Sequence, residues 1–238
     1  MIQKLFSVSN SAQRLRILES IQPNFCELIK NKQGTHTLQA FIDNFTCAEE
    51  FSFVSMEIRL DFYELCTNNN ATHFIQKVVK TFPLEYTLPY FNYTVENLLA
   101  FALDKNAMCV IKHMMRRFRE LAGQYEAYEP TVEVIRRQLI THVTFSVDRL
   151  IMDSYGNYVI QFCYELFDLD KCAGITERIL SKFAFYAVGK FSSNVILKCI
   201  SSYWTDKKIY NTLRGLTNSQ IVEIFRHKDG NKILLEIM

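Results

Sequence analysis

The chain of 238 residues contains few of the residues that form turns, with only seven glycines and four prolines. Such low numbers argue against an all-β fold with many tight turns and against a disordered chain. The sequence also has no run of about 18 apolar residues without charges, so we expect no membrane-spanning helix. Hydrophobic residues nevertheless make up 49% of the chain, enough to fill a core.

Paired cysteines are missing as well. The seven cysteines are scattered and form no C-x-x-C pair, which predicts neither a disulfide framework nor a zinc site. Reduced cysteines in apolar surroundings behave as small hydrophobes and favour a reducing compartment. We therefore expect a cytoplasmic protein, with the nucleus or nucleolus as the alternative, and we expect no metal and no cofactor.

Motifs of the common enzyme classes are absent too. The sequence has no G-x-S-x-G, H-E-x-x-H, phosphate-binding loop or glycine-rich dinucleotide motif, so we do not expect an enzyme. The net charge of +2 is small for a protein that holds nucleic acid chiefly through phosphate contacts. Any nucleic acid bound by this chain would have to be held more by base stacking and contacts to base edges than by charge.

What the sequence does contain is a recurring five-residue segment. Successive copies begin 37, 36, 49, 36 and 38 residues apart, a period typical of stacked helical repeats. We predict one solenoid over residues 1–238, with about six repeats, a partial repeat at the N-terminus and an inserted loop near residues 120–131. The six segments are residues 35–39, 72–76, 108–112, 157–161, 193–197 and 231–235.

Each repeat is predicted to contain a first amphipathic helix, a short polar turn and a second helix that opens at the recurring segment. Ile209 to Arg226 and Ala173 to Phe185 are examples of the first helix. On a helix the first and fifth residues of the segment lie on one face, and the second lies beside them. Asn157 and Gln161 would thus present two amides to a base edge, with Tyr158 offering a ring for stacking, as recognition of single-stranded RNA requires.

These segments resemble the repeats of the Pumilio (PUF) family of RNA-binding proteins. The closest matches are Asp153–Gln161 and Lys190–Cys199, and Gly34–Gln39 and Ala71–Gln76 are also similar. The resemblance covers nearly the whole chain. It implies an all-α, right-handed α-solenoid shaped as a crescent, whose concave face binds single-stranded RNA with one base per repeat. The order of the repeats is similar to the third through eighth of the family.

The resemblance also implies roles for individual residues. Asn157, Tyr158 and Gln161 match the family's set for uridine. Thr35 with Gln39 and Thr72 with Gln76 are less standard and are expected to face adenine, with His36 and His73 as stacking residues. The remaining candidates for RNA contact are Ser193, Asn194, Asn231, Lys232, Met108, Cys109, Lys112 and Gln3.

Several positions depart from the family pattern. Ser193 and Asn194 match a guanine-reading repeat, but Leu197 stands where an acidic residue would accept hydrogen bonds from guanine. Leu235 similarly replaces a polar residue after Asn231. A site without the polar partner discriminates weakly. We therefore predict relaxed or altered specificity instead of the family's usual 5′-UGU start.

The family resemblance implies a sequence-selective regulator of messenger RNA translation or decay, which binds uridine-containing 3′-untranslated regions and recruits partner proteins. The segment Trp204–Lys208 is a candidate loop for such partners. We expect no DNA and no membrane partner. Two alternatives stay open: a degenerate relative that binds structured or pre-ribosomal RNA with little sequence preference, and an α-solenoid scaffold for proteins. Because both ends fall inside a repeat, the sequence is predicted to be an excerpt of a longer protein.

Overall fold

The computed structural model describes residues 1–121, 129–203 and 207–237, and every regular element within these ranges is helical. The all-α fold class is therefore confirmed. The helices form two compact units. Unit 1 comprises Met1–Glu96 and Lys105–Arg117, and unit 2 comprises Asn97–Asp104 and Phe118–Met238.

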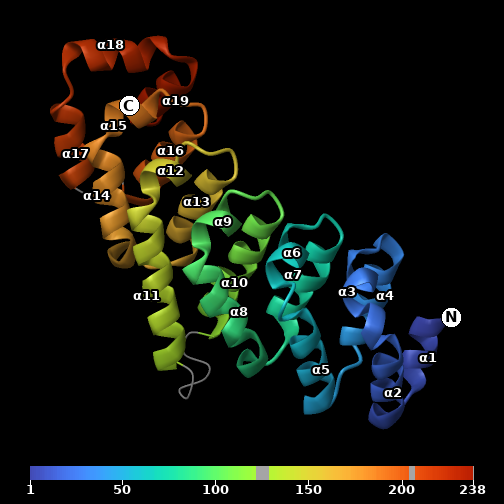
Figure 1. Cartoon of the computed structure of the whole chain (residues 1–238). Helices are drawn as coiled ribbons and strands as arrows, with labels where there is room; N and C mark the ends of the chain where they lie inside the picture. Colours follow the sequence, from blue (N-terminus) through green and yellow to red (C-terminus); the bar gives the residue numbers. More distant parts are fainter. Residues whose placement is uncertain (122–128, 204–206, 238) are drawn as a thin grey trace. The chain divides into compact units, whose positions relative to one another are not determined.

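In unit 1 the helices that carry the recurring segments lie side by side, and α4 packs against α7 (Figure 1). Helices α2 and α5, which come first in their repeats, form a second row, and α5 continues that row onto α8. The elements are α1 (Ile2–Val8), α2 (Ser11–Ile21), the 3₁₀ turn η1 (Gln22–Asn24), α3 (Phe25–Lys30), α4 (Lys32–Ile42), α5 (Ala48–Ile58), α6 (Phe62–Thr67), α7 (Ala71–Thr81), α8 (Leu84–Glu96) and most of α10 (Ala107–Leu121).

Unit 2 has the same arrangement, with the segment-bearing helices α13, α16 and α19 packed in succession. Helix α14 packs on α11 in the other row. The elements are α9 (Leu98–Ala102), the end of α10, α11 (Glu129–Phe145), α12 (Val147–Leu150), α13 (Gly156–Leu166), the 3₁₀ turn η2 (Leu169–Cys172), α14 (Ala173–Ser181), α15 (Phe183–Ala187), α16 (Ser192–Tyr203), α17 (Lys207–Arg214), α18 (Asn218–Arg226) and α19 (Lys228–Ile237).

Each repeat contains three helices, whereas the sequence predicted two. The expected helix from Ala173 to Phe185 is interrupted at Lys182, whose backbone angles (φ −124°, ψ 27°) are not helical. The expected helix from Ile209 to Arg226 is interrupted after Arg214, and Thr217 caps a new helix by accepting a hydrogen bond from the amide of Gln220. The break at Lys182 starts the short middle helix α15, which buries Phe183 and Tyr186.

A small residue directly precedes every recurring segment. A Cβ atom at Gly34 would lie 2.3 Å from the carbonyl oxygen of Leu28, and one at Gly156 would lie 2.9 Å from that of Leu150. The segment-bearing helix thus approaches the preceding short helix so closely that its first turn has room for little more than backbone. The six small residues are Gly34, Ala71, Ala107, Gly156, Ser192 and Gly230.

The starts of α4, α7 and α13 are fixed by side chains four residues before the segment. The Asn31 side chain accepts hydrogen bonds from the amides of Gln33 and Gly34, so α4 begins at Lys32, three residues before the segment at which the sequence predicted its start. Asn68 and Asp153 accept equivalent bonds before α7 and α13. Such capping satisfies amides that have no partner within the helix. In these three repeats the capping side chain stands at the same distance, four residues, before the segment.

The predicted insertion near residues 120–131 is partly helical. Helix α10 continues to Leu121 and α11 begins at Glu129, and the remaining part of the expected loop lies outside the described residues. The candidate partner loop at Trp204–Lys208 falls mostly outside them too, and its last two residues begin α17. Among the helices of the described ranges, none is both long and apolar enough to cross a membrane.

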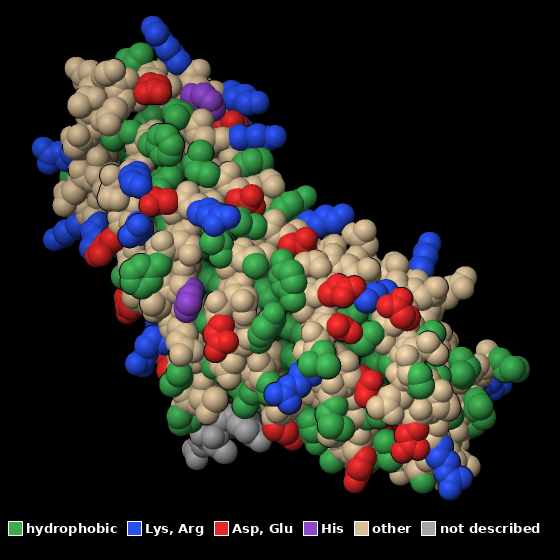
Figure 2. Space-filling view, viewed as in Figure 1, with side chains coloured by type: hydrophobic (Ala, Val, Ile, Leu, Met, Phe, Trp, Pro, Cys, Tyr) green, Lys and Arg blue, Asp and Glu red, His purple; other side chains and the backbone are tan. Residues whose placement is uncertain are grey.

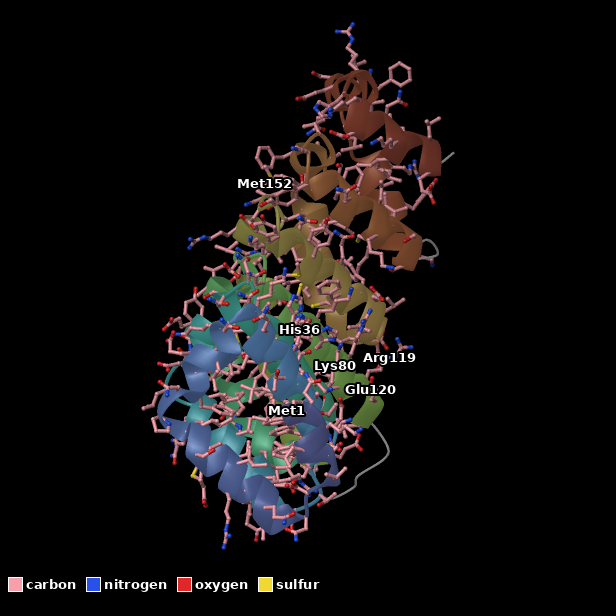
Figure 3. The ribbon with its side chains drawn as sticks, turned by 90° about the vertical axis from the view of Figure 1, so that its right-hand side faces the viewer. Met1, His36, Lys80, Arg119, Glu120 and Met152 are labelled. Carbon is pink, nitrogen blue, oxygen red and sulfur yellow. The ribbon has the colours of Figure 1, made fainter. Side chains whose placement is uncertain are left out.

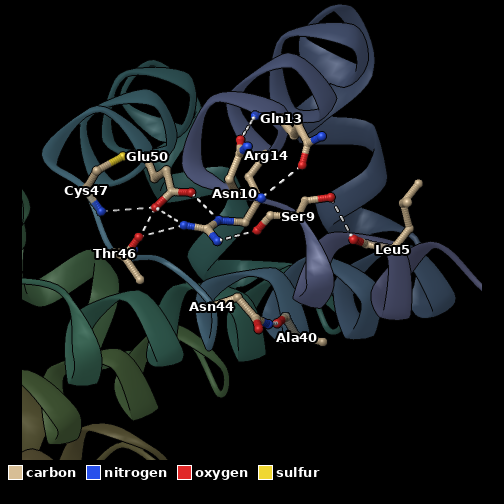
Figure 4. Close-up of polar contacts among 10 residues, drawn as sticks. All are labelled: Leu5, Ser9, Asn10, Gln13, Arg14, Ala40, Asn44, Thr46, Cys47 and Glu50. Carbon is tan, nitrogen blue, oxygen red and sulfur yellow. Dashed lines mark hydrogen bonds and ion pairs between the residues drawn. The ribbon is translucent and has the colours of Figure 1, made fainter.

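A buried ion pair links two neighbouring repeats in unit 1 (Figure 4). The guanidinium Nε of Arg14 on α2 donates to Glu50 on α5 over 2.5 Å, and the two side chains are only 7% and 0% exposed. Arg14 also donates to the Ser9 carbonyl and to the Thr46 hydroxyl, while Glu50 accepts from the amides of Thr46 and Cys47. Buried charges are tolerated when they are paired and hydrogen-bonded in this way.

Candidate nucleic-acid interface

The recurring segments occupy one register in all six repeats. The second residue is exposed in five repeats and half-buried in one, Cys109. The first residue is buried in four repeats and half-buried in Met108 and Asn231. The fifth residue is half-buried except for Leu235, which is 67% exposed. The side chains that solvent or a ligand can reach are therefore those of the second and fifth positions.

In three repeats the first and fifth side chains are hydrogen-bonded to each other. The Gln161 amide donates to the side-chain oxygen of Asn157 over 2.8 Å. Gln39 donates to Thr35 over 3.3 Å and Gln76 donates to Thr72 over 3.1 Å. This agrees with helical geometry, which puts residues four apart on one face. The glutamine amide is thereby oriented before any ligand arrives.

The first residues are anchored to the protein, although the sequence predicted that Asn157 presents its amide outward. Asn157 is 2% exposed, and its side-chain nitrogen donates to the carbonyl oxygens of Asp153 and Ser154. Thr35 and Thr72 donate to backbone carbonyls of the next repeat, those of Asn70 and Asn106. A short polar residue satisfies buried carbonyls here, so Gln161 carries most of the accessible amide surface.

A hollow of about 480 Å³ lies between α4 and α7 in unit 1. Its walls hold the second and fifth residues of two consecutive repeats, and Lys77, Lys80 and Thr81 extend it toward the end of α7. His36 and Lys80 are labelled in Figure 3. The structure thus brings together four residues that the sequence assigned to RNA contact: His36, Gln39, His73 and Gln76.

Unit 2 has an equivalent hollow of about 510 Å³. Tyr158 and Gln161 of α13 line it together with Asn194 and Leu197 of α16. The ring of Tyr158 is 46% exposed and lies stacked on Phe162, with centroids 6.4 Å apart, so it is supported from within the helix. The remaining lining residues are Lys198, Ser201 and Glu236, which the sequence analysis did not single out.

The other predicted contact residues are less well placed. Gln3 is exposed on α1, and Met108, Cys109 and Lys112 are half-buried on α10. Ser193 is buried, and its hydroxyl donates to the carbonyl of Lys190 over 3.5 Å. Lys232 is exposed and pairs with Asp229 on its own helix, next to the half-buried Asn231. These residues share the register but line neither hollow.

Basic side chains cluster at the Lys80 end of the unit 1 hollow, around His113. Burial, followed by the charges of Lys80, Arg116 and Lys112, lowers the pKa of His113 to about 4. His113 is therefore neutral near pH 7 and does not add to the positive charge of its neighbours. Elsewhere, Figure 2 shows lysines and arginines interspersed with acidic side chains over the face in view. The two cations that matter here are Lys80 and Arg116, each of which stands eight residues after the first residue of its segment.

Metal binding has no support in the described residues, where groups of three or more His, Cys, Asp or Glu side chains in ligating arrangement do not occur. The seven cysteines are all free. Burial raises the pKa of Cys172 to about 12, as expected for a thiol that serves as a small apolar side chain.

Three-helix repeats that present side chains in a fixed register define an α-solenoid. A family model described as the Pumilio-family RNA binding repeat matches residues 1–22, 24–58, 61–91 and 146–180, just over half of the chain. The chain therefore belongs to the Pumilio family, which confirms the resemblance seen in the sequence. Because this model describes an RNA-binding repeat, the prediction that the chain is not an enzyme is confirmed as well. The three segments with glutamine at the fifth position lie within the matched ranges, and the three that depart from the pattern lie outside them.

Curated relatives cover most of the chain. A Pumilio domain-containing protein of Schizosaccharomyces pombe is 28% identical over 198 residues, covering 83% of this chain and 27% of the relative. Pumilio homolog 12 of Arabidopsis thaliana is 26% identical over 243 residues, covering 98% and 38%. The chain thus spans about a third of the length of these relatives.

Solved structures share the fold. PUF-6 in complex with 5BE13 RNA has a TM-score of 0.89 at 18% identity, covering 99% of this chain and 68% of that one. The Puf4 RNA binding domain bound to HO endonuclease RNA 3′ UTR recognition sequence has a TM-score of 0.84 at 23% identity, covering 99% and 71%. At these identities the likeness establishes the α-solenoid fold.

Proposed function

We propose that this chain binds single-stranded RNA through the face formed by its segment-bearing helices, with one base per repeat. The observation that carries the proposal is the pair of hollows, because each is lined by second and fifth residues of consecutive repeats. A base entering such a hollow meets a stacking side chain on its face and a polar side chain at its edge, which is how single-stranded RNA is read. The RNA complexes of PUF-6 and Puf4 support the same use of this fold.

Uridine is the base that we assign to the repeat of α13. Both N–H groups of the Asn157 amide are directed to backbone carbonyls, whereas Gln161 uses one N–H and keeps its carbonyl oxygen. That oxygen can accept from N3–H of uracil while the second N–H donates to a neighbouring uracil oxygen. The ring of Tyr158 supplies stacking, which is worth about 1–3 kcal/mol per base.

The cellular role that fits this chemistry is regulation of messenger RNA through 3′-untranslated sites, with partner proteins acting on translation or decay in the cytoplasm. The 3′ UTR sequence bound by Puf4 supports the proposed binding to 3′-untranslated sites. An RNA-binding protein with little sequence preference is the second candidate, and the apolar side chains of Leu197 and Leu235 at reading positions favour it.

In vitro selection from a random single-stranded RNA pool tests the proposed function. We expect an enriched motif with uridine at one fixed position. We also expect Tyr158→Ala to weaken binding of every selected RNA by about 5- to 150-fold, because it removes a stacking surface without touching a base edge. Tyr210→Ala, which truncates an exposed tyrosine of α17, serves as the matched control. Enrichment without a motif would favour the second candidate, and a folded chain that enriches no RNA would contradict the proposal.

The basic cluster beside the unit 1 hollow should contribute by pairing with RNA phosphates. For the double variant Lys80→Ala/Arg116→Ala we expect the dependence of log K on log salt to flatten by about 0.7 for each phosphate that the variant no longer neutralises. The base preferences should stay as in the wild type, because phosphates carry no sequence information. Titrations at several salt concentrations measure the slope. Arg16→Ala/Arg59→Ala is the control, and an equal change of slope in that variant would contradict a local role for the cluster.

A further inference from the structure

Glu236 brings a carboxylate into the hollow of unit 2 from a different repeat. It belongs to α19, yet it lines the hollow together with Asn194, Leu197 and Lys198 of α16. It follows the first residue of its own segment, Asn231, by five positions. The residues at this position in the six repeats are Ala40, Lys77, His113, Phe162, Lys198 and Glu236. The repeat that ends in α19 is therefore the one with an acidic side chain there.

The lining charges suit one base better than the other three. An ionised carboxylate only accepts hydrogen bonds, and a lysine ammonium only donates them. Guanine has two adjacent donors on its Watson–Crick edge, N1–H and the N2 amino group, followed by the O6 acceptor. Adenine and cytosine each offer a single amino donor there, and uracil offers N3–H between two acceptors. Glu236 and Lys198 together match the donor and acceptor order of guanine.

The platform for such a base is also present. Tyr158 and Asn194 are both exposed and both line this hollow, so a planar ring between them has a surface on each face. Leu197 adds an apolar wall, and the hollow of about 510 Å³ leaves room for a purine.

We infer that Glu236 is a specificity-determining residue, which accepts the N1–H and N2–H groups of a guanine held between Tyr158 and Asn194. This inference rests on the proposed RNA-binding function. It changes the expectation drawn from Leu197, because the carboxylate that the α16 repeat lacks is supplied by the repeat that follows. Lys198 donates to guanine O6. Guanine is therefore selected at the base next to the uridine held by Gln161.

Parallel in vitro selections on the wild type, Glu236→Gln and Glu223→Gln test the inference. Glu223 is an exposed glutamate of α18 outside the hollow, so its replacement makes the same change of charge. We expect the wild type and Glu223→Gln to enrich guanine next to the uridine at the fixed position of the selected motif. In Glu236→Gln the preference for guanine over adenine should fall by about tenfold, as when a bidentate bond to a base edge is removed. The double variant Leu197→Glu/Glu236→Gln should restore it by placing a carboxylate on α16 itself.

The possible failures are distinguishable. An RNA motif identical in the wild type and Glu236→Gln would overturn the role of Glu236 and leave the proposed function standing. An equal loss of guanine preference in Glu223→Gln would also overturn the role of Glu236, because the change in net charge of the protein would then be the cause. Absence of RNA enrichment with the folded wild type would overturn both proposals at once. Circular dichroism melting of each variant confirms that the compared proteins are folded.

Discussion

Replacing Glu50 with alanine should lower the free energy of unfolding by about 3–5 kcal/mol, the cost of leaving a buried charge without its partner. The Arg14 guanidinium would remain buried and keep only its bonds to Ser9 and Thr46 (Figure 4). The amides of Thr46 and Cys47 would lose their acceptor as well. Urea denaturation measures the change.

Two further variants separate the ion pair from other effects. Glu19→Ala, which removes an exposed glutamate of α2, should leave the stability nearly unchanged. Arg14→Leu/Glu50→Leu should lose less stability than Glu50→Ala alone, because it removes both charges together. A loss in the double leucine variant as large as in Glu50→Ala would contradict an uncompensated charge as the cause.

The same pair predicts how stability changes with pH. Burial acts to raise the pKa of Glu50, but the hydrogen bonds from Arg14 and from the amides of Thr46 and Cys47 outweigh it and hold the pKa below its ordinary value of 4.5. A carboxyl whose pKa is lower in the folded state stabilises the fold fully above the unfolded pKa. This contribution is lost as the pH falls below about 4.5. Urea midpoints measured between pH 3 and 7 should therefore decline more steeply at the acid end for the wild type than for Arg14→Leu/Glu50→Leu.

The double variant Asn157→Ser/Gln161→Glu should shift the preference at one base from uridine toward guanine. The carboxylate at position 161 would accept from two guanine donors, whereas it cannot donate to the uracil oxygens. A bidentate contact to a base edge is worth about 1–3 kcal/mol of discrimination, so the ratio of guanine to uridine binding should rise by about tenfold or more. Competition binding with RNAs that differ at this base alone measures the ratio.

Helix α18 offers the matched control for this exchange. Asn218→Ser/Gln220→Glu introduces the same residue types outside the hollows, and glutamate at this capping position keeps the helix start intact. We expect its base profile to equal that of the wild type. An unchanged profile in Asn157→Ser/Gln161→Glu would instead show that α13 does not read a base with these residues.

The sequence alone was sufficient for the helical class, the family and the register of the recurring segments. Each of these follows from local spacing: a period near 36 residues sets the repeat, and residues four apart share a helix face. Such spacing puts Gln161 and Tyr158 on the accessible side of their helix without knowledge of any neighbour. The caps at Asn31, Asn68 and Asp153 were also readable in principle, because each stands four residues before its segment.

The tertiary structure decided what depends on contacts between repeats. The break at Lys182 arises where the middle helix α15 turns to bury Phe183 and Tyr186, which outweighs an unbroken amphipathic pattern. The burial of Asn157 and the entry of Glu236 into the hollow beside Leu197 have the same origin. A side chain contributed by the next repeat lies tens of residues away along the chain, so local periodicity carries no information about it, and only packing brings it to the base site.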